Sequence, residues 1–478
     1  MTQHLNIYKS ELSLLKISTM NRFLNYLIIF LIIFMWNCKS GHTGSRMTGS
    51  IKQDSLVTEN IFPFQSMHCH GSTIVVLPNN DLLVAWFQGS GERTADDVAL
   101  MGSRFSQKSG TWSNPFIMAD TPGFPDINPV LFIDNQSRLW LVWYTVLAYQ
   151  WESSVLKYRI SEDFMQNDGP PVWLWQDMIH VKPDGSVPEG IGRNDQFVKT
   201  LEKKYDDYHA SLVSEGYIRE DGSGTITEEM WQTARKQYLD IARGLNLVKN
   251  GAEVNEKGEK VSVQLGYPLM RRIGWQTRNK PLLAGNSIFL PLYSDGFDFS
   301  LIAITDDYGK TWHFSEPIVG AGNVQPALAT GSDSTITAYM RDNGPAPKRL
   351  MKSISGDMGV NWSTVSDTDI PNPGTAADVV VLKSGNRVIA HNDIEEGRHR
   401  LSVWLSKDEG KTWPCRKTII KGLPGSETRG HYPAIIQGKD GRIHMSFTNQ
   451  VPGPAGQQPL KTIAHASFTE EWLLNNKE

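Results

Sequence analysis

A short segment, TDDYGKTW at residues 305–312, returns twice in the C-terminal half of the chain, as SGDMGVNW at 355–362 and SKDEGKTW at 406–413. The shared pattern is (Ser/Thr)-x-Asp-x-Gly-x-x-Trp, and Asp307, Asp357 and Asp408 are spaced by 50 and 51 residues. In a hairpin turn, Asp accepts hydrogen bonds from turn amides, Gly adopts a positive φ and Trp packs back onto the sheet. The regular interval therefore predicts a β-sheet repeat protein in which these aspartates are structural.

A second repeat, out of phase with the first, marks one strand in each unit. In four places polar residues stand just before a Pro and an apolar strand; two further segments occupy the same place without the Pro. These six segments are 68–75, 126–131, 278–283, 323–328, 377–381 and 431–436. After each come a turn and a second strand, at 81–87, 138–144, 287–293, 335–340, 386–391 and 442–447. Six units of about 50 residues, each a four-stranded antiparallel sheet, predict an all-β fold, a six-bladed β-propeller over 61–470.

The spacing between the second and third units leaves room for a long insertion, 176–270, of helical character. Thr225 and Glu228 have the spacing of a capping box. One apolar stripe comprises Met230, Trp231, Ala234, Tyr238, Ile241 and Leu245, and another comprises Phe197, Leu201, Tyr205, Tyr208 and Leu212. Because long insertions in repeat proteins gather on the binding face, we expect this one on the pocket face of the propeller.

The N-terminus has the layout of an export signal. Arg22 precedes an apolar run over 27–36, and Cys38 follows it. The Cys directly after the run resembles a bacterial lipoprotein signal, which implies a lipidated Cys38 after removal of the preceding residues and a polar tether over 39–60. We expect an exported protein that is lipid-anchored to the membrane of the bacterial cell envelope, in the periplasm or at the outer membrane. An ordinary secretion signal and a membrane-spanning anchor are the alternatives.

Composition excludes several classes of function. The 47 Lys and Arg nearly balance the 51 Asp and Glu, which argues against binding nucleic acid through a broad basic surface. Three Cys cannot form a disulfide framework. His68 and His70 share one strand face, but no other Cys or His pair has metal-ligand spacing, so no metal or other cofactor is predicted.

The propeller repeat predicts which residues converge before any family is considered. The starts of the inner strands and the ends of the second strands lie on one face, around the axis. At the starts stand His68, His70, Asn128, Arg278, Lys280, Gln325, Asp378, His431 and Tyr432. At the ends stand Arg93, Asp97, Tyr144, Tyr293, Asp295, Arg341, Asp342, His391, Asp393 and Asn449. Polar residues in every blade predict a pocket; the alternative is that they only solvate the mouth of a channel.

The predicted pocket is rich in arginine and imidazole, which favours an acidic sugar as ligand because guanidinium forks bind carboxylates. The substrate-binding candidates are Arg93, Asn128, Arg278, Lys280, Gln325, Arg341, His391 and Arg429. With a uronate, a neutralised carboxylate makes the C5 proton more acidic, a His or Tyr removes it, and the group on C4 leaves. His70, His431 and Tyr432 are the catalytic candidates for this elimination, of the lyase or dehydratase type.

The Asp motif resembles the Asp box, or BNR repeat, of the sialidase superfamily. The segment HGSTIVVLPNNDLLVAWFQGSGERTADDVAL, residues 70–100, is similar to sialidase-like propellers known as exo-α-sialidases, and the resemblance covers 61–470. Sialidases carry an Arg-Ile-Pro motif where this chain reads PFQSMH at 63–68. Other similar propellers are polysaccharide lyases. The resemblance thus implies eliminating or hydrolytic chemistry, and a glycan-binding lipoprotein without catalysis is the third possibility.

Overall fold

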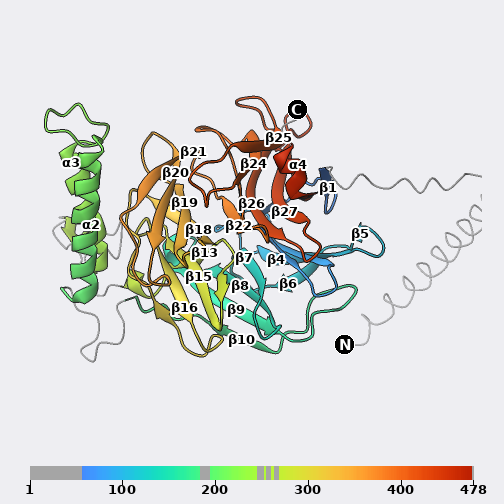
Figure 1. Ribbon diagram of the computed structural model, residues 1–478. Coiled ribbons are helices and arrows are strands. Elements are labelled where there is room, and N and C mark those ends of the chain that lie inside the picture. Colours follow the sequence, from blue (N-terminus) through green and yellow to red (C-terminus); the bar gives the residue numbers. More distant parts are fainter. Residues whose placement is uncertain (1–55, 184–193, 245–251, 255–259, 263–268, 476–478) are drawn as a thin grey trace, which may run out of the picture. The chain divides into compact units, whose positions relative to one another are not determined.

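The computed structural model describes residues 56–183, 194–244, 252–254, 260–262 and 269–475, all within one compact unit, Asp54–Glu478. The expected signal peptide and Cys38 lie outside these residues. Six antiparallel sheets form the six-bladed propeller that the repeats predict (Figure 1). No helix among the described residues is long and apolar enough to cross a membrane.

Blades 1 to 3 come from the first part of the chain. Blade 1 contains β2 (His68–Val76), β3 (Leu82–Gly89), β4 (Ala99–Ser106), β5 (Thr111–Trp112) and β6 (Phe116–Ala119). Blade 2 contains β7 (Asp126–Ile133), β8 (Leu139–Val146), β9 (Ser154–Ser161) and β10 (Trp175–Met178). Blade 3 contains β13 (Gln276–Thr277), β14 (Leu282–Ala284), β15 (Ser287–Ser294), β16 (Phe299–Thr305) and β17 (His313–Phe314). Its inner strand is split, because β13 and β14 both pair with β15.

Blades 4 to 6 follow without interruption. Blade 4 contains β18 (Asn323–Thr330), β19 (Ile336–Asp342), β20 (Arg349–Ser355) and β21 (Ser366–Pro371). Blade 5 contains β22 (Asp378–Val381), β23 (Arg387–His391), β24 (Arg400–Ser406) and β25 (Cys415–Lys421). Blade 6 contains β26 (Arg429–Gln437), β27 (Ile443–Val451) and β28 (Leu460–Phe468). The predicted first and second strands are all present, within a few residues of the expected bounds.

The ring is closed by a strand from the N-terminal side. β1 (Val57–Asn60) pairs with β28, from Val57 opposite Ser467 to Asn60 opposite Ala464, and so becomes the outermost strand of blade 6. The predicted tether, 39–60, therefore extends too far, because residues 57–60 belong to the propeller. A strand paired in this way protects the edge of the last blade.

The three Asp motifs form the hairpin turns predicted for them. Asp408 Oδ1 accepts a hydrogen bond from the Thr412 amide (2.8 Å), and Asp408 Oδ2 accepts one from Thr412 Oγ1 (2.6 Å). Gly410 has φ +86°, and its amide donates to Ser406 Oγ. The same contacts recur around Asp307 and Asp357. These aspartates stabilise turns and take no part in the pocket.

The insertion contains two helices, α2 (Gln196–Ser214) and α3 (Glu228–Ala242). The stripe predicted on α2 is buried throughout; on α3, Trp231 and Ile241 are buried whereas Met230 is exposed. The N-cap of α3 is Thr227, whose hydroxyl accepts from the Met230 amide, so the box predicted at Thr225 lies two residues too early. The other described elements of the insertion region are β11 (Ala252–Val254), β12 (Lys260–Ser262) and the 3₁₀ turn η2 (Leu269–Arg271); elsewhere in the chain there are a 3₁₀ turn, η1 (Trp151–Ser153), and a short helix, α4 (Glu470–Leu474).

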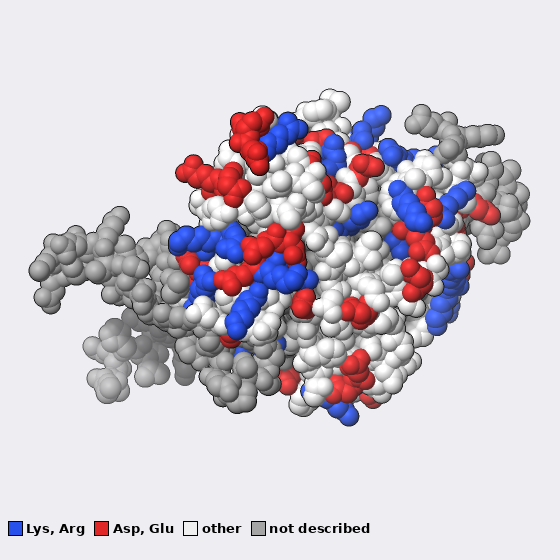
Figure 2. Space-filling view, turned by 60° about the vertical axis from the view of Figure 1, so that its left-hand side comes forward, with Lys and Arg blue, Asp and Glu red and all other residues white. Residues whose placement is uncertain are grey.

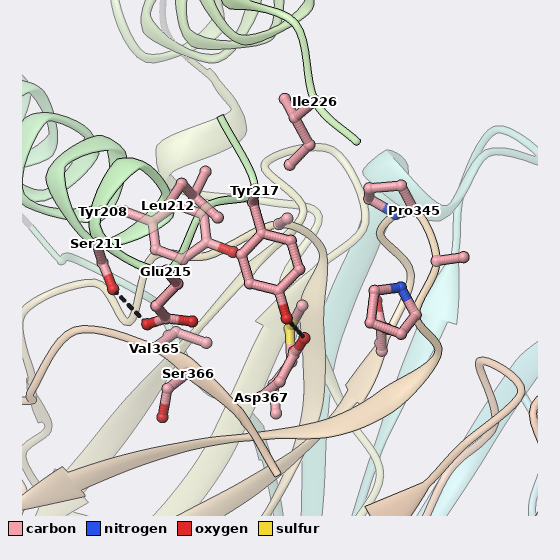
Figure 3. A pocket seen from close by; sticks show the side chains of 15 residues that line it. Tyr208, Ser211, Leu212, Glu215, Tyr217, Ile226, Pro345, Val365, Ser366 and Asp367 are labelled. Carbon is pink, nitrogen blue, oxygen red and sulfur yellow. Dashed lines mark hydrogen bonds between the residues drawn. The ribbon is translucent and has the colours of Figure 1, made fainter. Parts of the chain in front are cut away.

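The helices pack against blade 4 and the link that leads to it from blade 3. Lys204 Nζ donates to the Trp362 carbonyl and pairs with Glu316 (3.0 Å). Figure 3 shows the cavity between α2 and blade 4, where Tyr217 Oη donates to Asp367 Oδ2 over 2.9 Å. No described residue of 176–270 lines the axial pocket. The described part of the insertion lies beside this pocket, where Tyr238 Oη donates to Asp298 Oδ2 (3.3 Å) in the loop between β15 and β16, and it does not cover the pocket.

Charged side chains of both signs are mixed on the surface. On the face shown in Figure 2, Lys and Arg alternate with Asp and Glu and form no broad basic field. Ion pairs such as Lys203 with Asp207 and Arg235 with Asp206 occur on the insertion helices. The arrangement agrees with the near-neutral composition.

Candidate active site

A repeated backbone distortion brings polar side chains to the propeller axis. The register of the inner strand shifts after His70, Ile127, Val324 and His431. The next residue in each case has a positive φ: Gly71 (+62°), Asn128 (+47°), Gln325 (+56°) and Tyr432 (+56°). Positive φ is uncommon for residues other than Gly and is found where surrounding structure imposes it, often at functional sites. Gly is required in blade 1, since a Cβ at Gly71 would lie 2.4 Å from Asn128 Oδ1.

These bulges open onto a polar pocket of about 110 Å³. It is lined by His70, Phe87, Glu92, Ile127, Asn128, Tyr144, Trp151, Tyr293, Asp295, Gln325, Arg341 and Tyr432. As the repeat predicts, most of these residues come from inner-strand starts and second-strand ends. Asn128 Nδ2 donates to Tyr144 Oη (3.0 Å), and burial raises the pKa of Tyr144 and of Tyr293. Both phenols are therefore neutral hydrogen-bonding groups in the pocket wall.

The Tyr432 side chain has hydrogen-bonding, aromatic and cationic partners in and around the pocket. Its phenol oxygen accepts from Arg341 Nη1 (3.1 Å) and from Gln325 Nε2 (3.3 Å). Its ring centroid lies 4.0 Å from that of His70. The guanidinium carbons of Arg278 and Arg398 lie 5.2 and 5.5 Å from the ring centroid. Two donors therefore converge on the phenol oxygen and two cations lie beside the ring, so the oxygen is held at a fixed place among polar groups of the pocket.

The three arginines around Tyr432 have no carboxylate within 4.0 Å among the described residues. Arg278 is buried and donates to the carbonyls of Ser72, Tyr432 and Pro433, so it holds inner strands in place. Arg341 and Arg398 are half-buried, and Arg398 Nη1 lies 3.4 Å from His431 Nδ1. Burial lowers the pKa of Arg398. Cations without a counter-ion in a concave site favour an anionic ligand.

The two predicted catalytic histidines come together as the ring closure requires. The ring centroids of His70 and His431 are 4.8 Å apart, and His70 Nδ1 lies 2.8 Å from Thr448 Oγ1. Burial, followed by the charge of neighbouring basic groups, lowers the pKa of both imidazoles well below the usual value. At neutral pH both rings are uncharged, so each has one nitrogen that can accept a proton.

Two carboxyl groups in the pocket have pKa values shifted in opposite directions. Burial raises the pKa of Asp295 to about 6. Burial alone would raise the pKa of Glu92, but the close approach of His68 and nearby positive charge outweigh burial and lower it. Glu92 Oε1 lies 3.1 Å from His68 Nε2. Up to a pH of about 6, Asp295 is therefore able to donate a proton, whereas Glu92 is ionised.

Several predicted binding residues lie outside the pocket lining. Lys280 is paired with Asp378 (2.7 Å) and also donates to the Val379 carbonyl. His391 is buried against Trp404, and burial lowers its pKa to about 4. Arg93 stacks on Trp151, which does line the pocket, with 5.0 Å between its guanidinium carbon and the ring centroid. Arg429 lines a separate, neighbouring pocket.

Three important residues are absent from the sequence-based set: Glu92, Trp151 and Arg398. Each lies in a loop that joins the second and third strands of its blade, beyond the strand ends to which the prediction was confined. Arg93 and Asp97, in the same loop as Glu92, were included. Extending the predicted site from the strand ends into these loops would have added all three residues.

The comparisons with known proteins agree with this fold. The sequence model of a family described as BNR repeat-like domain matches residues 80–202 and 275–445, more than half of the chain. No curated protein matches the sequence. Similar solved structures include a protein of unknown function from Dyadobacter fermentans, with 13% identity, 87% of this chain and 99% of that chain covered, and a TM-score of 0.55.

Two sialidase structures are also similar. The leech intramolecular trans-sialidase has 11% identity, with 88% of this chain and 71% of that chain covered and a TM-score of 0.56. A sialidase described as Hadza microbial sialidase Hz136 has 12% identity, with 84% and 66% covered and a TM-score of 0.52. At such identities the likeness shows the fold. The chain therefore belongs to the BNR repeat-like domain family and has the six-bladed propeller fold of sialidases.

Proposed function

We propose that the protein is a carbohydrate-active enzyme whose axial pocket binds an acidic sugar. The observation that carries the proposal is the set of three arginines around Tyr432, none of which has a described carboxylate within ion-pair distance. Arg341 is the arginine that lines the pocket, and we assign it to the sugar carboxylate. The bonds of Arg278 to main-chain carbonyls give it a positioning role, because they hold the backbone of Tyr432.

The reaction that the pocket supports best is hydrolysis of a glycosidic bond. In the proposed first step, the Tyr432 phenol oxygen bonds to the anomeric carbon and gives its proton to the neutral His70 imidazole beside it, while the bond from that carbon to the departing oxygen breaks. Asp295, whose raised pKa of about 6 leaves it protonated in mildly acidic solution, gives its proton to the departing oxygen. Water then attacks the same carbon, its proton passes to the Asp295 carboxylate, and Tyr432 is released and takes its proton back from His70. Glycosidases of this retaining type use a nucleophile and an acid that becomes a base.

Elimination from a uronate is the second candidate, and a specific contact favours it. The His70 ring lies against Tyr432 and lines the pocket in its neutral form. In this reaction His70 removes the C5 proton, the electrons form a C4=C5 double bond, and the C4–O bond breaks. The departing oxygen takes a proton from Tyr432 or Asp295, and a carboxylate bound to Arg341 stabilises the charge that develops beside C5.

Product analysis in water labelled with heavy oxygen separates the two reactions. The purified protein is incubated with a panel of sialate- and uronate-terminated oligosaccharides. Hydrolysis incorporates one labelled oxygen into the released acidic sugar; elimination incorporates none and produces an unsaturated sugar that absorbs in the ultraviolet. Tyr149→Phe is a matched control, because this exposed phenol lies outside the pocket lining and contacts Asp96. Absence of any product from every acidic substrate would refute the enzymatic proposal.

We also propose export and lipid anchoring through Cys38. The apolar run that ends directly before this Cys supports the proposal. Residues after Cys38 then connect the anchor to the propeller, whose first strand begins at Val57. In that location the enzyme acts on glycans outside the cytoplasm.

A further inference from the structure

A second pocket, of about 190 Å³, lies beside the axial pocket. It is lined by residues 397–399, which lead into β24, by Gly425, Ser426 and Arg429 at and just before the start of β26, and by Pro373 from the link between β21 and β22. Its lining includes Arg398, His399, Ser426 and Arg429 and contains no carboxylate. The composition of this lining is that of an anion site, with two guanidinium groups, an imidazole and a hydroxyl.

The cations of this second pocket are only partly neutralised by the described residues. Arg429 Nη2 pairs with Glu427 (3.0 Å), and Arg429 Nε donates to the Ser426 carbonyl. Glu427 is shared, because Gln450 Nε2 donates to its other oxygen over 2.7 Å. In the described part of the chain Arg429 Nη1 has no hydrogen-bond partner and the Arg398 guanidinium has no ion pair; the latter lies beside the neutral ring of His431 and the face of Tyr432.

A further cation adds to the same positive field. Lys461, on β28, donates to His68 Nδ1 over 2.8 Å. Burial lowers the pKa of Lys461, and Arg398 and Arg429 lower it further, whereas Glu92 acts in the opposite direction. These positive charges repel one another in the free protein, and an anion that binds between them reduces this repulsion.

Arg398 connects the two pockets. It lines the second pocket, and its guanidinium carbon lies 5.5 Å from the ring of Tyr432, which lines the axial pocket. An anionic group in the second pocket is therefore next to a sugar bound against Tyr432. A ligand made of two linked sugars can then occupy both pockets at once. Because the sugars are linked, binding of the first raises the effective concentration of the second at its pocket, and the ligand binds more tightly than either sugar alone.

We propose that the second pocket binds an additional anionic group, carried by the sugar adjacent to the one in the axial pocket. The substrate class is then a glycan with acidic groups, carboxylate or sulfate ester, on neighbouring sugars, rather than one acidic sugar on a neutral chain. The pocket itself is assigned from its own residues, whereas the substrate class rests on the proposed function of the axial pocket.

A sulfate titration tests the second pocket without any catalytic assay. We expect inorganic sulfate to shift the NMR signals of the His399 ring in the wild type and in Arg341→Gln. Arg429→Gln should weaken this response about tenfold, because it removes a charge-assisted contact. Arg219→Gln, an exposed arginine on the insertion, is the matched control and should respond as the wild type does. Equal responses in Arg429→Gln and the control would overturn the proposal, as would a wild type that does not respond.

Binding of galacturonic acid and digalacturonic acid, measured by calorimetry, tests the substrate class. We expect the disaccharide to bind at least tenfold more tightly than the monosaccharide, and Arg429→Gln to remove that advantage while leaving monosaccharide affinity unchanged. A wild type that does not bind the disaccharide more tightly would refute the assignment of the second pocket to the neighbouring sugar. Unchanged monosaccharide affinity in Arg341→Gln would instead refute the proposed function of the axial pocket.

Discussion

Arg341 Nη1 donates to the phenol oxygen of Tyr432 over 3.1 Å, although one residue belongs to the second strand of blade 4 and the other to the inner strand of blade 6. The contact crosses the propeller axis region rather than following the sheet. It depends on two local features, the end of β19 and the bulge at Tyr432 with its positive φ. The contact therefore forms only when blades 4 and 6 are correctly placed around the pocket.

Tyr432→Phe should abolish most of the turnover and leave the fold intact. The phenol oxygen is the proposed reactive atom, and losing a catalytic group typically reduces the rate by about 10²–10⁴-fold. The ring and its contacts with His70 and Arg278 remain. Steady-state kinetics and a thermal melt, with Tyr149→Phe as control, check both statements. A folded Tyr432→Phe variant that retains wild-type turnover would sink the assignment.

Arg341→Gln should affect ligand binding, whereas Arg278→Gln should affect the stability of the fold. Arg341→Gln is expected to weaken binding of an acidic sugar by about 2–5 kcal/mol, because the bound carboxylate loses its charged partner. Arg278→Gln is expected mainly to lower the free energy of unfolding, by about 1–3 kcal/mol for each buried carbonyl left without a donor. Calorimetry and urea denaturation measure the two effects. The opposite pattern, with Arg278→Gln stable and Arg341→Gln binding normally, would contradict these roles.

Turnover should fall as the pH rises above about 6. The raised pKa of Asp295 means that its proton-donating form is lost in that range. Asp295→Asn should lower the rate and remove this limb of the pH profile. If the variant keeps the same limb, another group supplies the proton.

The same shift affects stability, with a defined sign. Between the ordinary Asp pKa of 3.8 and the folded value of about 6, the folded state binds more protons than the unfolded state. The free energy of unfolding therefore decreases as the pH rises through this window. Asp342, whose pKa burial also raises to about 6, contributes a similar slope. Urea melts of Asp295→Asn and Asp342→Asn should each show a shallower dependence than the wild type.

Tyr217→Phe should loosen the helical insertion without changing sugar kinetics. The substitution removes the hydrogen bond to Asp367 on blade 4 (Figure 3). No described residue of the insertion lines the axial pocket. Limited proteolysis should cut the insertion faster, while kcat and KM stay within twofold of the wild type. A large change in KM would show that the insertion contributes to substrate binding after all.

Cys38→Ser should release the protein from the membrane. With Cys38 as the lipidated residue, radioactive palmitate labels the wild type and not the variant, and cell fractionation moves the variant to the soluble fraction. Cys415→Ser is the control, because this thiol is buried in blade 5. Labelling that persists in Cys38→Ser would refute the anchor.

The repeats alone determined the architecture. The spacing of Asp307, Asp357 and Asp408 indicates hairpins that recur once per blade. The recurring polar and apolar segments indicate the strands, so blade number and strand order follow from local patterns. The convergence of His70, Asn128, Gln325, Arg341 and Tyr432 also followed, because equivalent positions in a closed repeat share one end of the axis. The α2 stripe was equally predictable, since helical periodicity is local.

Only the tertiary structure decided which of the polar residues are available to a ligand. By the repeat pattern, Arg278, Lys280 and Arg341 are equally good candidates for binding a ligand. In the structure, however, Arg278 donates to main-chain carbonyls and Lys280 is paired with Asp378. Glu92 and Arg398 reach the site from loops whose paths no periodicity describes. The insertion likewise packs beside blade 4 instead of over the pocket. Partner choice and loop path depend on contacts between residues far apart in the chain, and a local pattern carries no information about such contacts.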